Sequence, residues 1–239
     1  MKRADGREIN QLRNLTLTKN IFEYAPGSVL FEMGKTKVLC AVTLTENVPP
    51  FLRGKGTGWL TAEYSLLPAS TITRTFRESS SFKRNGRSVE ISRIIGRALR
   101  SIVDLSQFGE NTITIDCDVL QADGGTRCAA ICGAQAALNL AVKHWLDSKF
   151  IKQTIIKDQV AAVSTGVYDG IALLDLNAFE DNNIDSDFNF ILTDKNEIVE
   201  IQGTAELGTV SWVQFDAMRE LAVQGTKELS SFIKEQTLI

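Results

Sequence analysis

The amino-acid sequence predicts an α/β fold with mixed sheets, and we expect residues 1–239 to form a single domain. Three observations lead to this prediction. Apolar residues recur with a helical period between residues 89 and 105, and residues 112–119 alternate between apolar and polar side chains, as a half-buried strand does. Predicted strands and helices also follow one another without a Pro- or Ser-rich linker, so the sequence marks no domain boundary.

The first predicted elements are two strands. Residues 28–33 and 36–43 are rich in apolar and β-branched side chains, and Gly34 permits a tight turn between them. Residues 50–86 hold several glycines, Pro68 and a polar end. We therefore expect them to be the longest irregular part of the chain.

A helix is predicted over residues 89–105, because at about 100° per residue its apolar side chains fall on one face. These are Ile91, Ile94, Ile95, Ala98 and Ile102, with Leu99 at the edge. Arg93, Arg97 and Arg100 fall on the opposite face, which is either solvated or in contact with another subunit.

The predicted strand at 112–119 carries Asp116 and Asp118 on its polar side, and an Ala-rich helix follows at about 127–147. The second half of the chain repeats this order of elements. Strands are predicted at 159–166, 170–176, 188–193 and 197–202, before a closing amphipathic helix at about 212–235. The order of elements suggests an internal duplication of a strand-rich unit followed by helices.

Composition excludes several classes of protein. With 44% apolar and 23% charged residues the chain is an ordinary globular protein, and its net charge of −3 argues against coating nucleic acid by bulk charge. No apolar run approaches the roughly 20 residues that span a bilayer, and the N-terminus lacks the apolar core of a secretion signal. We therefore expect a cytoplasmic protein with no membrane partner.

The reactive side chains narrow the chemistry. The four cysteines are scattered and mostly lie in apolar segments, so we expect buried, reduced thiols, as in cytosolic proteins. The only histidine, His144, lies in an apolar helix, where a structural role is expected. A His-based catalytic triad and a zinc hydrolase are therefore nearly excluded.

Charge is distributed unevenly along the chain. Between residues 74 and 100 eight basic residues accompany two acidic ones, whereas between 169 and 206 ten acidic residues accompany one lysine. Such a chain can place an anion and a divalent cation side by side. The alternative is two solvated faces of opposite sign.

The sharpest motif is Ala-Asp-Gly-Gly-Thr-Arg at residues 122–127, between a predicted strand and a predicted helix. Gly124 and Gly125 let backbone N–H groups approach a ligand, and the first helical turn offers unpaired donors. Thr126 adds a hydroxyl and Arg127 a forked cation. Together these groups suit phosphate, whereas the alternative is a plain turn in which Thr126 caps the helix.

Other charged residues extend this hypothesis. Arg87 opens the 89–105 helix region and could clamp the same anion. Carboxylates that follow the 170–176 strand could hold Mg²⁺, although acidic loops are often only solvated. They are Glu180, Asp181, Asp185 and Asp187.

Arg74 and Arg77 flank Phe76 in a polar loop. Charge combined with an aromatic ring suits backbone and base contacts to single-stranded RNA, and a solvated loop fits the pattern equally well.

Six segments resemble the ribonuclease PH family of bacterial phosphorolytic enzymes that mature tRNA 3′ ends. The segments are Arg3-Ala-Asp-Gly-Arg7, Gly34-Lys-Thr-Lys-Val-Leu-Cys40, Gly58-Trp-Leu-Thr-Ala-Glu-Tyr-Ser-Leu-Leu-Pro68, Gly86-Arg-Ser-Val-Glu-Ile-Ser-Arg-Ile-Ile-Gly-Arg97, Asp116-Cys-Asp-Val-Leu-Gln-Ala-Asp-Gly-Gly-Thr-Arg127 and Val199-Glu-Ile-Gln-Gly-Thr-Ala-Glu206. They run in order from residue 3 to residue 206, so the likeness covers nearly the whole chain.

The resemblance implies an RNase PH-like fold with an internally repeated β-α unit and an unusual left-handed β-α-β crossover. It also implies a homohexamer, built as a trimer of dimers. The implied activity removes 3′-trailer nucleotides from tRNA precursors with inorganic phosphate as co-substrate, releases nucleoside diphosphates, and runs in reverse to add nucleotides. The alternative is a non-catalytic RNA-binding subunit of an exosome-like ring.

The resemblance also implies roles for individual residues. The phosphate-binding residues would be Arg87, Gly125, Thr126 and Arg127. The catalytic carboxylates, which hold the divalent cation Mg²⁺, would be Asp181 and Asp187. The RNA-binding arginines would be Arg74 and Arg77.

The sequence departs from the family at a few positions. Ala178 stands where tyrosine is common, Cys128 where threonine is usual, and Leu207 where glycine is common, and the stretch to Val210 lacks a phenylalanine often found there. None of these changes removes a transferred catalytic group. They bear on substrate handling or local packing.

Overall fold

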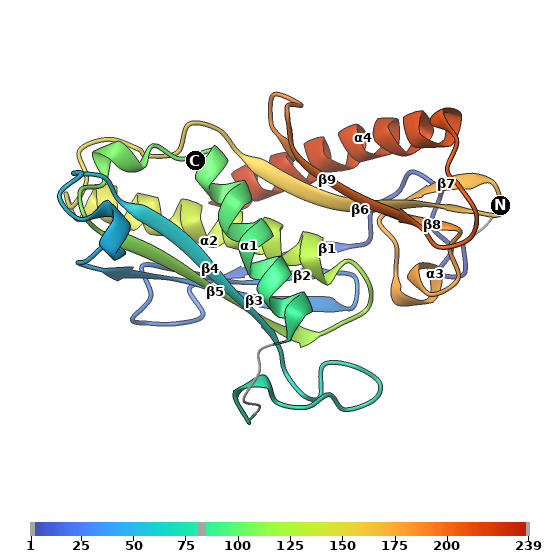
Figure 1. Cartoon of the computed structure of the whole chain (residues 1–239), viewed down its shortest axis with the longest axis horizontal. Helices are drawn as coiled ribbons and strands as arrows, with labels where there is room; N and C mark the ends of the chain where they lie inside the picture. Colours follow the sequence, from blue (N-terminus) through green and yellow to red (C-terminus); the bar gives the residue numbers. More distant parts are fainter. Residues whose placement is uncertain (1–2, 81–84, 238–239) are drawn as a thin grey trace.

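The structure, a computed structural model, describes residues 3–80 and 85–237. Two β-sheets and three long helices make up most of it (Figure 1). In chain order the first half contains β1 (Leu15–Lys19), β2 (Gly27–Met33), β3 (Thr36–Thr45), β4 (Trp59–Leu66), α1 (Gly86–Ser101), β5 (Thr112–Gln121) and α2 (Thr126–Asp147). The second half contains β6 (Val160–Tyr168), β7 (Ile171–Leu174), α3 (Ala178–Asp181), β8 (Ser186–Thr193), β9 (Ile198–Ala205) and α4 (Trp212–Thr237).

The first sheet has the strand order β1-β2-β3-β5-β4 and the second has the order β7-β6-β8-β9. The paired strands are antiparallel except for β4 and β5, which run parallel and are connected through α1. This is the β-α-β crossover that the family resemblance implies, and its left-handedness stays a prediction. Each sheet is followed by a long helix, in agreement with the repeated order of elements.

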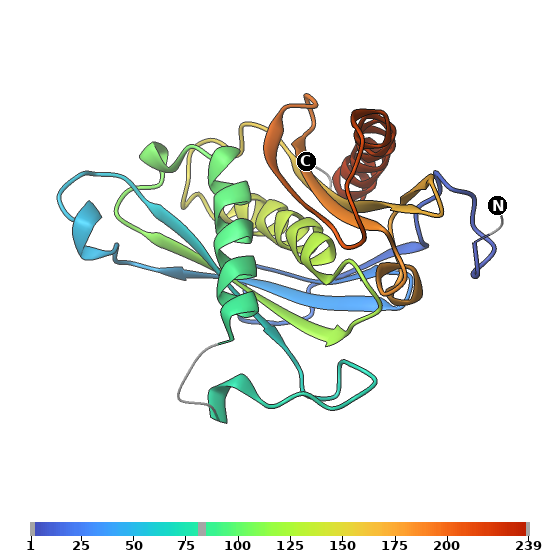
Figure 2. The same cartoon turned by 45° about the vertical axis from the view of Figure 1, so that its right-hand side comes forward.

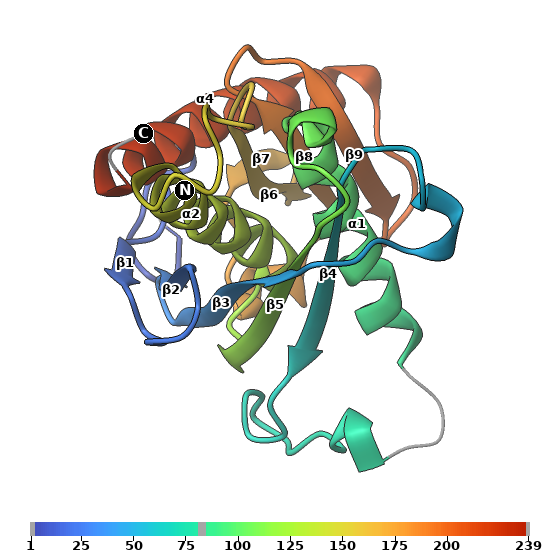
Figure 3. The same ribbon diagram turned by 90° about the vertical axis from the view of Figure 1, so that its left-hand side faces the viewer.

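Helix α2 lies against both sheets, with β2, β3 and β5 on one side and β6 on the other (Figure 3). Its small side chains allow this close approach. A Cβ atom on Gly133 would lie 2.7 Å from the Cys40 sulfur, and one on Gly27 of β2 would lie 2.1 Å from the Ala137 carbonyl oxygen. The Ala-rich composition of α2 is therefore a packing requirement of a helix that is buried nearly all round.

Most predicted elements are confirmed, with shifted ends. The helix expected at 89–105 covers 86–101, and its predicted apolar face is buried. The expectation that residues 50–86 are irregular is wrong for β4. In β4 the side chains of Leu60, Ala62 and Tyr64 point into the core. The glycines before this segment indicate a loop, but pairing with β5 makes the segment a strand.

Strand β1 was not expected from the sequence, and it pairs only at the edge of the first sheet. The four cysteines are free and buried, as predicted. His144 is exposed near the end of α2 that lies far from Arg127, so its side chain is not part of the core. Of the helices in the described residues, none has the length and apolar character needed to cross a membrane.

Candidate active site

The turn between β5 and α2 has a backbone conformation that requires glycine. Gly124 and Gly125 have φ values of +75° and +63°. A Cβ atom on Gly124 would lie 2.6 Å from the Asn177 carbonyl carbon, at the start of α3. The two glycines therefore bring the phosphate motif directly against the segment that precedes Asp181.

Arg13 and Thr36 hold this turn in place through hydrogen bonds to its backbone. Arg13 Nη1 donates to the Asp123 carbonyl oxygen at 2.6 Å, while its Nη2 and Nε bind the two carboxylate oxygens of Asp175 at 2.7 and 3.0 Å. Thr36 accepts from the Asp123 amide at 3.0 Å and donates to the Gly124 carbonyl oxygen at 2.7 Å. The carbonyl groups of the turn are thus held toward the protein interior.

The start of α2 is open to an anion. Gly125 is the N-cap residue and, within the described chain, no side chain caps this end of the helix. The alternative in which Thr126 caps the helix is wrong, because Thr126 is the first helical residue and its hydroxyl accepts a hydrogen bond from Tyr64 at 2.9 Å. The first amides of a buried 22-residue helix therefore retain their donor capacity and the positive end of its dipole.

Arg127 has an unsatisfied donor at this position. Its side chain is 16% exposed and makes one long ion pair, with Glu90 of α1 at 3.4 Å. Its Nε is buried and, among the described residues, has no hydrogen-bond partner. A buried guanidinium donor without a partner is costly, and an anion bound at the start of α2 would satisfy it.

Arg87 lies in the first turn of α1, where Asn85 caps the helix by accepting from the Arg87 amide at 3.0 Å. Glu90, three residues further along α1, pairs with Arg127 at 3.4 Å, so the first turn of α1 lies beside the start of α2. The structure therefore brings together Arg87, Gly125, Thr126 and Arg127, the four residues expected to bind phosphate. Their roles stay a prediction.

The predicted carboxylates lie on neighbouring elements, Asp181 at the end of α3 and Asp187 in β8. Burial, and to a lesser degree the negative charge of Asp181, raise the pKa of Asp187 to about 6. Burial also raises the pKa of Asp181, although the positive charges of Arg87 and Arg127 lower it in part. The negative charge of Asp181 thus acts on Asp187, and the positive charge of Arg127 acts on both carboxylates.

Glu180 does not belong to this site. Arg3 binds both carboxylate oxygens of Glu180, at 2.6 and 2.5 Å, and Glu180 is 5% exposed. Its carboxylate also accepts from the Asn177 amide and completes a capping box for α3. The expectation that Glu180 helps to hold a cation is wrong, because a buried arginine already neutralises it. Its role is to anchor the short helix that presents Asp181.

A hydrogen-bonded chain lies behind Asp187. Asn189 Nδ2 donates to Asp187 Oδ2 at 3.4 Å, and the Cys128 thiol donates to Asn189 Oδ1 at 3.2 Å. Burial raises the pKa of the Cys128 thiol well above its usual value, which keeps the hydrogen on the sulfur.

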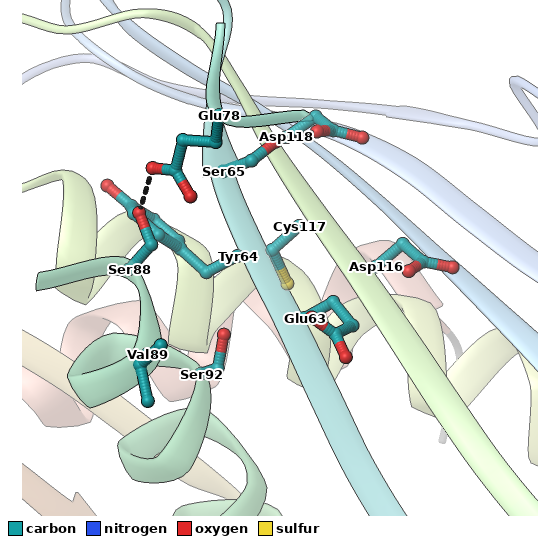
Figure 4. Close-up of a pocket in the computed structure, with 10 residues that line it drawn as sticks. All are labelled: Glu63, Tyr64, Ser65, Glu78, Ser88, Val89, Ser92, Asp116, Cys117 and Asp118. Carbon is teal, nitrogen blue, oxygen red and sulfur yellow. Dashed lines mark hydrogen bonds between the residues drawn. The ribbon is translucent and has the colours of Figure 1, made fainter. Parts of the chain in front are cut away.

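A cavity that shares Tyr64 with the site is lined by carboxylates and does not suit an anion. It has a volume of about 420 Å³ and lies between β4, β5 and α1 (Figure 4). Its wall carries the carboxylates of Glu63, Glu78, Asp116 and Asp118. Burial raises the pKa of Asp116, and the charges of Asp118 and Glu63 add to this shift. The open end of α2 is therefore the better candidate for an anion site, and Tyr64 contacts both places, because it lines the cavity and donates to Thr126.

Arg74 and Arg77 lie elsewhere. They are exposed in an arm formed by residues 67–80, which projects from the end of β4 away from both sheets (Figure 2). Ile72 and Phe76 of the arm are 106% and 90% exposed. The structure leaves these arginines free to meet RNA or another subunit, and their role stays a prediction. Lys83 and Arg84 of the basic window lie outside the described residues.

Residues that the motif did not single out complete the site. Arg13 holds the turn, Tyr64 orients Thr126, and Asn189 binds Asp187. Tyr64 lies within a segment that resembles the family, which was the available signal. Arg13 and Asn189 carried no local signal, because their partners are distant in the sequence.

The carboxylate pair fits Mg²⁺. In the part of the chain that the structure describes, no three His, Cys, Asp or Glu side chains are grouped as a metal site. Mg²⁺ does not require such a group, because it commonly binds one or two carboxylates and takes its other ligands from water and phosphate oxygens. Asp181 and Asp187 offer those two carboxylates, and burial is the main cause of their raised pKa values.

Comparison with known proteins matches two family models in succession. The model for domain 1 of the 3′ exoribonuclease family matches residues 11–143, and the model for domain 2 matches residues 158–225. Ribonuclease PH from Syntrophomonas wolfei is 50% identical over 234 residues, which cover 98% of each chain.

Solved structures with the same fold have lower identity. Rrp46 from rice (Oryza sativa) has a TM-score of 0.78 at 22% identity, covering 98% of this chain and 100% of that one. An Archaeoglobus fulgidus exosome with RNA bound to the active site has a TM-score of 0.81 at 21% identity, covering 98% and 93%. At such identities the likeness shows the fold alone, which is the mixed α/β fold expected from the sequence.

Proposed function

The chain belongs to the 3′ exoribonuclease family, and from this premise we propose that it is a phosphorolytic 3′→5′ exoribonuclease of the ribonuclease PH type, a phosphate-dependent tRNA nucleotidyltransferase. Its substrates would be tRNA precursors and other RNA 3′ ends. The observation that carries the proposal is the buried Arg127 Nε, which lacks a hydrogen-bond partner among the described residues and lies at a start of α2 that no described side chain caps. The charge of Arg127 also acts on both Asp181 and Asp187.

In this proposal the first amides of α2, Thr126, Arg127 and Arg87 hold inorganic phosphate as the attacking reagent. Tyr64 donates to the Thr126 oxygen, so the Thr126 hydrogen is free to point to the phosphate. The phosphate oxygen attacks the last phosphodiester bond of the RNA, the bond to the 3′ oxygen breaks, and a nucleoside diphosphate leaves. Phosphoryl transfer depends mainly on positioning and charge stabilisation, so it needs no catalytic histidine.

Asp181 and Asp187 would hold Mg²⁺, which when bound supplies positive charge to the phosphoryl oxygens and the leaving oxygen. The side chains do the positioning. Asn189 restrains Asp187. The capping box of Asn177 and Glu180, together with the Arg3–Glu180 ion pair, fixes the helix that carries Asp181.

We also propose a homohexamer, assembled as a trimer of dimers, in the cytoplasm. Support comes from the solved structures of similar fold, one of which is an exosome. The exposed apolar residues of the arm and the exposed Arg93 of α1 are surfaces that a neighbouring subunit could cover. The other two arginines on this face of α1 are engaged within the chain: Arg97 pairs with Glu200 at 2.6 Å, and Arg100 donates to the Leu60 carbonyl and lies over the Trp59 ring. The buried, free cysteines agree with a reducing compartment.

A tRNA with extra 3′ nucleotides tests the function. The protein is incubated with it and Mg²⁺, with and without phosphate, and the released nucleotides are identified. Nucleoside diphosphates that appear only with phosphate support the proposal. Monophosphates that appear regardless of phosphate would indicate a hydrolytic nuclease. Binding of the tRNA without any release would indicate a non-catalytic ring subunit.

A further inference from the structure

We propose that Cys128 is a positioning residue for the carboxylate of Asp187. The inference deepens the proposed function, because it rests on Asp181 and Asp187 as the pair that holds the divalent cation. Cys128 acts through Asn189, and none of its atoms is expected to touch substrate or cation.

The geometry of the chain carries the inference. Cys128 is the third residue of α2 and is fully buried, and Asn189 of β8 is 5% exposed. The thiol hydrogen points to Asn189 Oδ1 at 3.2 Å, and the opposite side of the same amide, Nδ2, faces Asp187 Oδ2 at 3.4 Å. One thiol thus connects the first turn of the phosphate-binding helix to the carboxylate in the second sheet.

The direction of the amide decides what Asp187 meets. If the Asn189 amide were reversed, its oxygen would face the Asp187 carboxylate, and both groups are acceptors. A donor on the other side of the amide disfavours that reversal, and the buried Cys128 thiol is such a donor. The result is one restrained oxygen on Asp187, while the other oxygen stays available for a ligand.

A pair of nearly isosteric variants isolates this hydrogen bond. Cys128→Val removes the donor and Cys128→Thr supplies a hydroxyl in nearly the same volume. The full-length protein is titrated with Mn²⁺ without RNA or phosphate, and bound ion is measured by electron paramagnetic resonance. We expect Cys128→Val to weaken Mn²⁺ binding about 10-fold, the lower end for losing a group that orients a metal ligand, and Cys128→Thr to retain it.

A double-mutant cycle tests the route through Asn189. In an Asn189→Ala background the Val and Thr variants should bind Mn²⁺ equally, because the connecting amide is gone. A Val variant that binds Mn²⁺ as tightly as the unaltered protein overturns the proposal. So does a Thr variant as weak as the Val variant, or a difference between Val and Thr that persists without Asn189.

Stability and function are separated by two further measurements. Thermal unfolding of each variant checks that the fold is intact, and if Cys128→Val does not fold, Cys128→Ser and Cys128→Ala form a smaller pair with the same logic. The phosphate KM is expected to stay unchanged in the Val variant. If the unaltered protein released no nucleotide from tRNA, the proposed function would fail, whereas Mn²⁺ binding would still decide the role of Cys128.

Discussion

Two clusters of charge lie back to back in this protein, and they differ in how completely their charges are paired. In the inner cluster Arg3, Arg7 and Arg13 are buried and bind Asp175 and Glu180 through several short contacts. In the outer cluster Arg87 and Arg127 lie near Asp181 and Asp187, the Arg127 Nε has no partner in the described chain, and the pKa of Asp187 is raised.

The difference separates structure from function. A buried ion pair with satisfied hydrogen bonds is a fixed part of the fold, whereas unsatisfied charges of both signs in one place are arranged for a ligand. The inner cluster holds α3 and the turn between β5 and α2, where phosphate is proposed to bind, in place. The outer cluster is the candidate active site.

The largest effect is expected from breaking the inner cluster. Arg13→Met should lower the free energy of unfolding by about 3–5 kcal/mol, because the buried Asp175 carboxylate loses its main partner. Chemical denaturation at fixed protein concentration measures this. Arg219→Ala, which breaks an exposed pair with Asp216, is the control and should change stability by about 0.5 kcal/mol or less. Equal losses in the two variants would contradict the distinction.

Removal of Arg127 should leave the fold intact and impair the reaction. Arg127→Ala is expected to cost about 2–4 kcal/mol of transition-state stabilisation, the scale for losing one preorganised donor. The readout is kcat/KM for phosphate with a tRNA substrate. Arg219→Ala again serves as the control. Full phosphorolysis by Arg127→Ala at low phosphate would exclude Arg127 from the clamp.

The pKa of Asp187 gives a pH-dependent prediction. Its folded-state pKa of about 6 lies above the ordinary value of 3.8, so its ionised form destabilises the fold. This cost develops as pH rises from 3.8 to about 6 and is complete above that.

Asp187→Asn should therefore raise the unfolding temperature at pH 8 when divalent cations are removed, and the gain should disappear toward pH 4. Mg²⁺ should stabilise the unaltered protein more than the variant. An Asp187→Asn protein that is less stable at pH 8 than at pH 4, relative to the unaltered protein, would contradict the shift.

The smallest effect is expected in the arm. If Arg74 and Arg77 each contact one RNA phosphate, the double variant Arg74→Ala/Arg77→Ala should reduce the slope of log binding constant against log salt by about 1.4. The RNA KM should rise and the phosphate KM should not change. An unchanged salt slope would mean that the arm arginines are only solvated.

The sequence was informative where one element carries its own signal. The helical period of α1, the alternation of β5 and the glycines of the phosphate motif each lie within a short window, and the structure agrees with them. The sequence did not predict strand β4, because this segment becomes a strand only by pairing with β5, about 50 residues away in the chain. The sequence also allows Thr126 to cap α2, but in the structure Gly125 is the N-cap residue and Tyr64 binds the Thr126 hydroxyl.

The sequence by itself determined the family and the α/β class, and it predicted which residues would hold phosphate and a divalent cation. Only the tertiary structure decided which charged side chains are paired in buried contacts that stabilise the fold. Glu180 and Asp181 are adjacent in sequence and equal in charge, yet Arg3 buries one and the other remains at the site. The physical reason is that pairing, burial and the resulting pKa depend on side chains that lie more than a hundred residues apart in the chain and meet only when it folds.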